Sequence, residues 1–267
     1  MSLLLWPIKG ACCRIAACSG LVFVVAAAAG AAAQSSKSSL PAQVTTDEVV
    51  REMVEHNDER AARLKLYSSE RHYHLEYKGF PHGAEASMDV EATCDGQTYK
   101  TFRVLSQSGS HFLVDHVLKR LLVSEQEAAR VQPSNALTPD NYRFQLVGRT
   151  VVDGRPVYEL QVEPRRAANY LYRGEIWVDT NDYAVAQLNA EPAKSLSFWI
   201  RKVDIHRVYL KSDGFWLPQW DRSETKTRFG GTAVLTIDYG TYNFSNSGTQ
   251  VSLASENQPE MKLQTVR

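Results

Sequence analysis

Short runs in which apolar and polar residues alternate dominate the second half of the chain and predict a meander of antiparallel strands. Between Val147 and Leu188, four such runs are separated by turn signals, of which Asp153-Gly154 and Asn181-Asp182 are the clearest. Asp, Asn and Gly tolerate the positive φ angles that tight hairpin turns require. From Tyr142 onward the pattern predicts strands at about 142–152, 156–164, 170–179, 183–191, 196–210, 214–227 and 232–244.

Three further strands are predicted before the meander. Residues 67–78 and 84–94 each place apolar side chains on one face and polar side chains on the other. After the Asp95-Gly96 turn, Phe102 and Val104 alternate with polar neighbours. Period-two alternation of this kind is typical of a sheet with one buried and one solvated face. Cys94 falls on the apolar face, which predicts a packed side chain rather than a nucleophile.

Two amphipathic helices interrupt the strand pattern. Apolar residues recur at steps of three and four within 50–64, after a start marked by Thr46, and again within 113–122. Ser124 and Glu127 have capping-box spacing and predict a separate short helical turn over 125–131. Each helix is expected to bury its apolar stripe against the sheet.

Together these elements predict a mainly β (α+β) fold, a large curved antiparallel sheet that forms an unclosed β-barrel with amphipathic helices as a lid. About ten strands curl through their right-handed twist, and the helices then cover the apolar concave face. Such a face is suited to acyl chains or other hydrophobic material. The residues predicted to line the hydrophobic cavity and lid are Tyr73, Leu75, Tyr77, Met88, Val90, Phe102, Val104, Leu113, Val117, Leu121, Trp177 and Trp216.

Four tryptophans of the late strands, Trp177, Trp199, Trp216 and Trp220, leave two interpretations open. They can line a ligand cavity, or they can be ordinary packing and rim residues, because aromatic residues are favoured in strands. Basic residues also gather on two of these strands and predict a solvated outer face; they are Arg201, Lys202, Arg207, Arg222, Lys226 and Arg228.

The N-terminus has the features of an export signal. Lys9 and Arg14 precede an apolar run, and small residues before Gln34 match a cleavage site near Ala33. We therefore expect a signal peptide at 1–33, a polar linker at 34–44, one domain at 45–246 and a loose tail at 247–267, in the periplasm. An uncleaved N-terminal membrane anchor is the alternative, and lipidation at Cys18 is disfavoured because the apolar run follows this cysteine.

Charge and motifs indicate a binding protein without a catalytic site. Thirty basic residues balance thirty acidic ones, which favours neither a nucleic acid nor an anionic membrane as partner. The chain has no metalloprotease, nucleophile-elbow, phosphate-loop or dinucleotide motif. His72 and His74 share a strand face, but spacing fixes no third ligand. Ser108-Gly109-Ser110-His111 is better explained as a helix cap than as a nucleophile turn. We expect no catalytic residues, no metal and no cofactor.

Turn residues give the chain a resemblance to a known family. They run from Thr138-Pro139-Asp140-Asn141-Tyr142 through Gly148, Asp153-Gly154-Arg155, Tyr158-Glu159-Leu160 and Pro164 to Ile176-Trp177-Val178-Asp179, Asp182 and Val185. Over residues 45–244 this pattern resembles the outer-membrane lipoprotein-sorting (LolA-like) family.

The resemblance implies an unclosed antiparallel β-barrel with a helical lid, whose interior holds the acyl chains of lipoproteins in transit between membranes. We expect a monomeric periplasmic carrier of lipoprotein acyl chains or lipid, with inner- and outer-membrane transport components as partners. In that family an arginine near the third strand supports the closed lid; Lys100 and Arg103 lie in that region, and neither is assigned the role. The alternative is a periplasmic regulatory module of the same fold that binds a membrane signalling protein. A third hypothesis is a hydrolase built on the His72 and His74 face.

Overall fold

The sheet predicted from the alternating pattern forms the body of the protein. The structure, a computed structural model, describes residues 44–80, 82–95, 99–130, 135–194, 198, 200–228 and 230–245. The predicted signal peptide, the linker except Val44, the tail, Cys18, Trp199 and the Gly96 turn position lie outside the described residues. Within them the elements are α1 (Thr46–Arg63), β1 (Leu66–Gly79), β2 (Ala84–Asp95), β3 (Tyr99–Gly109), α2 (His111–Leu113), η1 (Val114–Leu118), α3 (Lys119–Arg130), β4 (Tyr142–Val152), β5 (Arg155–Pro164), β6 (Tyr172–Asp179), β7 (Val185–Pro192), β8 (Ile200–Ser212), β9 (Phe215–Thr227) and β10 (Gly231–Ser245).

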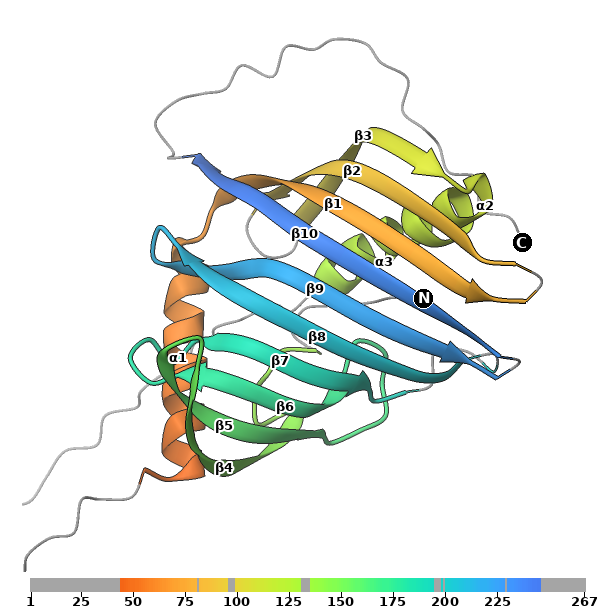
Figure 1. Cartoon of the computed structure of the whole chain (residues 1–267). Helices are drawn as coiled ribbons and strands as arrows, with labels where there is room; N and C mark the ends of the chain where they lie inside the picture. The colour runs from red at the N-terminus through yellow and green to blue at the C-terminus, as the bar shows by residue number, and fades with distance from the viewer. Residues whose placement is uncertain are drawn as a thin grey trace, which may run out of the picture.

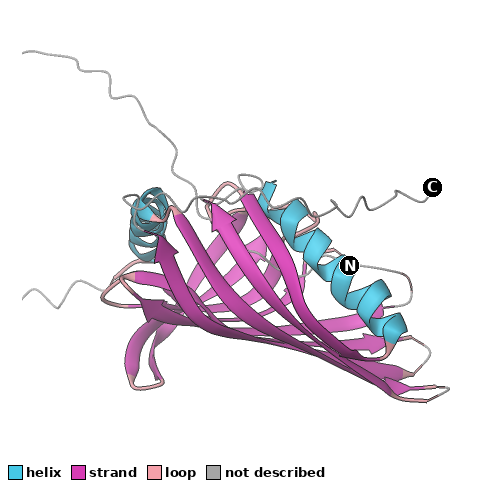
Figure 2. Cartoon of the chain, turned by 90° about the horizontal axis from the view of Figure 1, so that it is seen from above, coloured by secondary structure: helices cyan, strands magenta, loops and turns pink. Residues whose placement is uncertain are grey.

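All ten strands of the described chain join one antiparallel sheet in the order β3-β2-β1-β10-β9-β8-β7-β6-β5-β4. The chain therefore winds as a meander from β4 to β10, and β10 then pairs with β1 (Figure 1). Strands β3 and β4 form the two edges of the sheet. The predicted fold class is confirmed, since the sheet curls without closing and helices lie on one side of it (Figure 2).

Tight turns set the register of the meander as the sequence predicts. Val152 pairs with Arg155 across the two turn residues Asp153 (φ 50°) and Gly154 (φ 77°). Two successive positive φ angles define the turn type that matches the twist of a hairpin. Between β6 and β7 the carboxylate of Asp179 accepts hydrogen bonds from the backbone N–H groups of Asn181 and Asp182, both at 2.9 Å. This side-chain turn is the second predicted turn of the meander.

The helical segments cover the apolar face at its two ends. Helix α1 begins at its cap Thr45, one residue before the predicted Thr46, and Val49, Val50 and Met53 are buried. The hydroxyl of Thr46 accepts a hydrogen bond from the backbone N–H of Leu146 in β4. Helices α2, η1 and α3 follow one another without a break and lie over β2 and β3 (Figure 2).

The prediction of a separate turn beginning at Ser124 is wrong. Ser124 lies inside α3 and is buried, so its hydroxyl does not start a helix. A π-helical turn at η1 instead joins the first helical residues to α3 and keeps the segment continuous. The expected cap is found earlier, where the hydroxyl of Ser110 accepts a hydrogen bond from the backbone N–H of Leu113 at 3.5 Å.

Candidate functional site

The apolar interface between the sheet and the helix α2–η1–α3 is the candidate cargo site. Six of the predicted cavity residues are buried together in one core cluster: Tyr73, Leu75, Met88, Val90, Leu113 and Leu121. Tyr77, Phe102 and Val117 are partly buried and pack against that cluster. Strand and helix periods thus placed these residues on the apolar face, and their role in binding cargo stays a prediction.

Three predicted residues lie away from the interface. Val104 in the edge strand β3 is 39% exposed. Trp177 pairs with Glu159 and Gln187, so it shares the polar face of the sheet. Trp216 is half-buried at the end of β9, where its indole N–H donates to the Asp182 carboxylate at 2.9 Å. Strand alternation alone did not show which face each late strand turns inward.

A buried ion cluster ties the lid helix to the sheet. Glu125 of α3 is 1% exposed, and its Oε2 lies 3.0 Å from Nη1 of Arg71 in β1. Nζ of Lys100 in β3 is 3.8 Å from the same oxygen. The hydroxyl of Tyr73 donates to Oε1 at 3.1 Å. One carboxylate on the helix thus contacts side chains of two strands.

Electrostatics in this cluster depend on the single carboxylate. Burial penalises the charged form of Arg71, yet Tyr73 and Glu125 together raise the pKa of Arg71 well above its usual value. Burial, with the nearby Arg71, lowers the pKa of Lys100 to about 8. The guanidinium carbon of Arg71 also lies 4.9 Å from the ring centroid of Tyr239 and 5.6 Å from that of Phe102. Cation and aromatic rings attract each other at these distances.

A second buried pair lies on the same face of the sheet. Arg207 of β8 is 1% exposed and donates to Oδ2 of Asp221 in β9, with 2.9 Å between Nε and Oδ2. Burial raises the pKa of Asp221, although Arg207 opposes the shift. The other carboxylate oxygen, Oδ1, is buried without a hydrogen-bond partner among the described residues. The placement of Arg207 on a solvated outer face is therefore wrong.

Sequence reasoning missed Arg71, Glu125 and Asp221, although a signal was present for Arg71 and Glu125. Arg71 occupies an apolar-face position, two residues before Tyr73. Glu125 comes four residues after Leu121, on the apolar stripe of the helix. A charged residue that breaks an apolar period is buried only when it has a partner. The pairing itself needed the tertiary structure.

The polar positions considered for chemistry are surface contacts. Nδ1 of His72 donates to Oδ1 of Asp89 at 2.6 Å, and Nδ1 of His74 lies 2.9 Å from the Ser87 hydroxyl. Among the residues that the structure describes, no group of three His, Cys, Asp or Glu side chains is arranged to hold a metal ion. Cys94 is buried, as its apolar position predicted.

Fold and interface define a class of protein, an open antiparallel half-barrel whose apolar face is covered by helices. The chain belongs to a family of unknown function (DUF5686), whose model matches residues 36–245. No curated protein matches the sequence. Over the described ranges, no helix has the length and apolar character needed to cross a membrane.

Solved structures that are similar to this chain come from several bacteria. A DUF1329 family protein from Desulfovibrio piger is 16% identical, with a TM-score of 0.43 over 78% of this chain and 96% of that one. A putative outer membrane lipoprotein-sorting protein domain from Vibrio parahaemolyticus is 11% identical, with a TM-score of 0.38 over 73% of this chain and 93% of that one. The LolA superfamily protein NE2245 from Nitrosomonas europaea is 13% identical, with a TM-score of 0.35 over 76% of this chain and 95% of that one.

Proposed function

We propose that this chain is a non-catalytic periplasmic binding protein that takes up acyl chains or lipid between its sheet and its lid helix. One observation supports this most directly: at β2 and β3 the apolar sheet face is covered by one helical segment, α2–η1–α3, which a buried ion cluster holds to the sheet. The five buried leucine and valine side chains of this segment are Leu113, Val114, Leu118, Leu121 and Leu122.

The size of this apolar contact limits what can open the lid. Burial of a Leu or Val side chain contributes about 1.5–3 kcal/mol, so five of them stabilise the closed lid by about 7.5–15 kcal/mol, which is an upper estimate. Water cannot replace those contacts. An acyl chain that slides beneath the helix replaces apolar contact with apolar contact, so cargo of this class can shift the equilibrium toward an open lid.

Export of the chain and its monomeric state belong to the same proposal. The leader predicted at residues 1–33 would place the domain in the periplasm, where a carrier exchanges cargo between membranes. The lipoprotein-sorting resemblance supports lipoprotein acyl chains as the cargo, with membrane transport components as donors and acceptors. The fold accommodates this role without catalytic groups, because capture and release need only a reversible lid.

Lipid capture can be tested directly. The full chain, expressed with its own leader, is purified from the periplasmic fraction and its bound lipids are extracted for mass spectrometry. After lipid removal, a dansyl-labelled fatty acid is titrated against it, and we expect a blue shift and enhanced emission. Glu125→Gln should raise the association rate at least severalfold, because the lid then loses its anion. Glu127→Gln, the same change at an exposed position of α3, serves as the matched control.

Two results would contradict the carrier proposal. One is a protein that carries no lipid and does not bind the fatty-acid probe. The other is a stable complex with one membrane signalling protein that persists when lid residues are changed, which would favour the regulatory alternative. Hydrolase activity that depends on His74 would point instead to the third hypothesis.

A further inference from the structure

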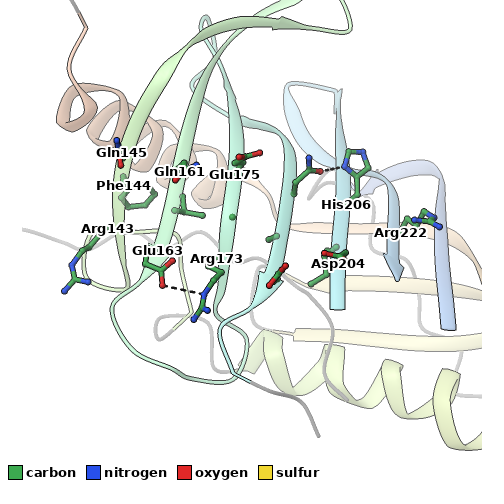
Figure 3. A pocket seen from close by; sticks show the side chains of 16 residues that line it. Arg143, Phe144, Gln145, Gln161, Glu163, Arg173, Glu175, Asp204, His206 and Arg222 are labelled. Carbon is green, nitrogen blue, oxygen red and sulfur yellow. Dashed lines mark hydrogen bonds and ion pairs between the residues drawn. The ribbon is translucent and has the colours of Figure 1, made fainter. Parts of the chain in front are cut away.

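The face of the sheet away from the helices is hollowed. A groove of about 930 Å³ crosses β4 to β9, and most of its lining side chains are polar (Figure 3). Register places these side chains opposite the core, because buried Leu160, Val162 and Ile176 alternate with them along the strands. The groove is thus independent of the lid. Its volume is in the range of small-molecule binding sites.

The floor of the groove is a continuous row of polar side chains. Each member is the direct cross-strand partner of the next, in the order Gln145, Gln161, Glu175, Asn189, His206 and Arg222. Adjacent strands lie about 4.8 Å apart, so the row offers a hydrogen-bonding group at each step across the sheet. Figure 3 shows Gln145, Gln161 and Glu175 side by side on neighbouring strands.

Three of the six side chains in this row are available to bind a ligand through hydrogen bonds. The Nδ1 of His206 donates to the amide oxygen of Asn189. Gln145, Gln161 and Glu175 make no side-chain hydrogen bond or ion pair with any residue in the described ranges. A primary amide has two donors and an acceptor oxygen, and a carboxylate accepts several hydrogen bonds. These three groups can bind hydroxyl groups through paired donors and acceptors.

Charge along the groove does not favour a highly charged ligand. The basic lining residues are Arg143, Arg173 and Arg222, and the acidic ones are Glu163, Glu175, Glu191 and Asp204. Much of this charge is paired within the protein. Arg173 lies 3.5 Å from Glu163, and Lys202 lies 3.2 Å from Glu191 and 2.6 Å from Asp204. With a balance of minus one and internal pairing, the groove lacks the excess of either sign that a polyion would need.

Aromatic rings stand on the same face beside the row. The ring of Trp220 lies 5.4 Å from that of His206, between ring centroids. Trp177 is two residues from Glu175 on β6, and both side chains are on this face. Trp presents a large apolar face together with a polar N–H. Trp177 lies beside Glu175 and Trp220 beside His206, both at the margin of the groove. Rings placed beside such a polar row suit a ligand whose units have apolar C–H faces and hydroxyl rims.

We propose that this groove binds a neutral oligosaccharide chain. Sugar rings stack on Trp177 and Trp220, and their hydroxyl groups bond to Gln145, Gln161 and Glu175. An extended peptide fits less well, because peptides bind sheets by pairing with a free edge strand. Five of the six groove strands are internal, with their backbone groups already paired to neighbours on both sides.

The test uses the full chain purified after export and three neutral probes: cellohexaose, maltohexaose and chitohexaose. Binding is followed by tryptophan fluorescence and by calorimetry at millimolar ligand. We expect at least one probe to bind and to change the tryptophan emission. Gln161→Ala and Trp177→Leu should each weaken that binding about tenfold or more, as the loss of a well-made contact predicts.

His74→Ala is the matched control, since His74 continues the same polar row on β1 outside the groove. It should bind the probe like the parent protein. Binding of the dansyl fatty acid should be unchanged in Gln161→Ala, which separates this site from the carrier proposal. The proposal is overturned if no neutral probe binds, if polygalacturonate binds more tightly, or if the groove variants bind like the parent protein.

Discussion

Replacing Glu125 by Gln removes the only anion that contacts Arg71 and Lys100 beneath the lid, among the residues described. With an effective dielectric constant of about 20, attraction across 3.0 Å and 3.8 Å amounts to roughly 5.5 and 4.4 kcal/mol. Desolvation offsets much of this, so the net loss on breaking a buried pair is about 3–5 kcal/mol. Glutamine keeps the shape of the side chain, and the loss is therefore electrostatic.

The loss of unfolding free energy in Glu125→Gln is measured by urea unfolding at pH 7, monitored by circular dichroism. Glu127→Gln should change the free energy of unfolding by no more than about 0.5 kcal/mol, because surface substitutions rarely do more. A double-mutant cycle with Arg71→Met should give a coupling of about 2–3 kcal/mol, since the two residues are in contact. Hydrogen exchange should locate the added opening in α3 rather than in the central strands.

A loss below about 1 kcal/mol in Glu125→Gln would refute this account, because exposed pairs contribute only that much. It would mean that the pair is already solvated and that the lid is open most of the time in solution. A large loss with no coupling to Arg71 would also contradict it. Lys100 or Tyr73 would then be the main partner of the carboxylate.

Three further predictions concern pH and the backbone. The pKa of Lys100 is about 8 in the folded protein and 10.5 in the unfolded chain, so between these pH values only the unfolded chain keeps the proton. The free energy of unfolding should therefore rise with pH across this range, by about 3 kcal/mol at most. Urea titrations should show this rise in the parent protein and not in Lys100→Met. Burial raises the pKa of Asp58 from 3.8 to about 6, so its folded carboxylate is destabilising above that pH; Asp58→Asn should raise Tm at pH 7 but not below pH 4, and an equal gain at both would contradict the cause. Gly174 has φ 149°, and an added Cβ would lie 2.7 Å from Cα of Ala190. Gly174→Ala should therefore lower the free energy of unfolding, measured in urea, by about 1–3 kcal/mol or more. Gly148→Ala should not lower it, because an added Cβ there has no atom within 4 Å.

The sequence by itself determined the strands, the two amphipathic helical stretches and the tight turns of the meander. Alternation and turn signals together predicted ten strands, because a half-buried sheet imposes a period of two on most of its strands. Asp153-Gly154 fixed the first hairpin of the meander, because few residue pairs accept its two positive φ angles. The apolar stripe from Leu113 to Leu121 predicted a helix that needs a surface to cover, and the structure places it on β2 and β3. These features are local, so a single chain segment contains the whole signal.

Only the tertiary structure decided which charged side chains go inside and what the outer face presents. Arg71 and Glu125 are 54 residues apart, and the local sequence around one does not indicate that the other is its partner. Trp177 changed from an expected cavity residue to a neighbour of the polar row, because the face of a late strand is set by pairing across the whole sheet. The row from Gln145 to Arg222 draws one residue from each of six strands. Such a site exists only once cross-strand register has brought its members together.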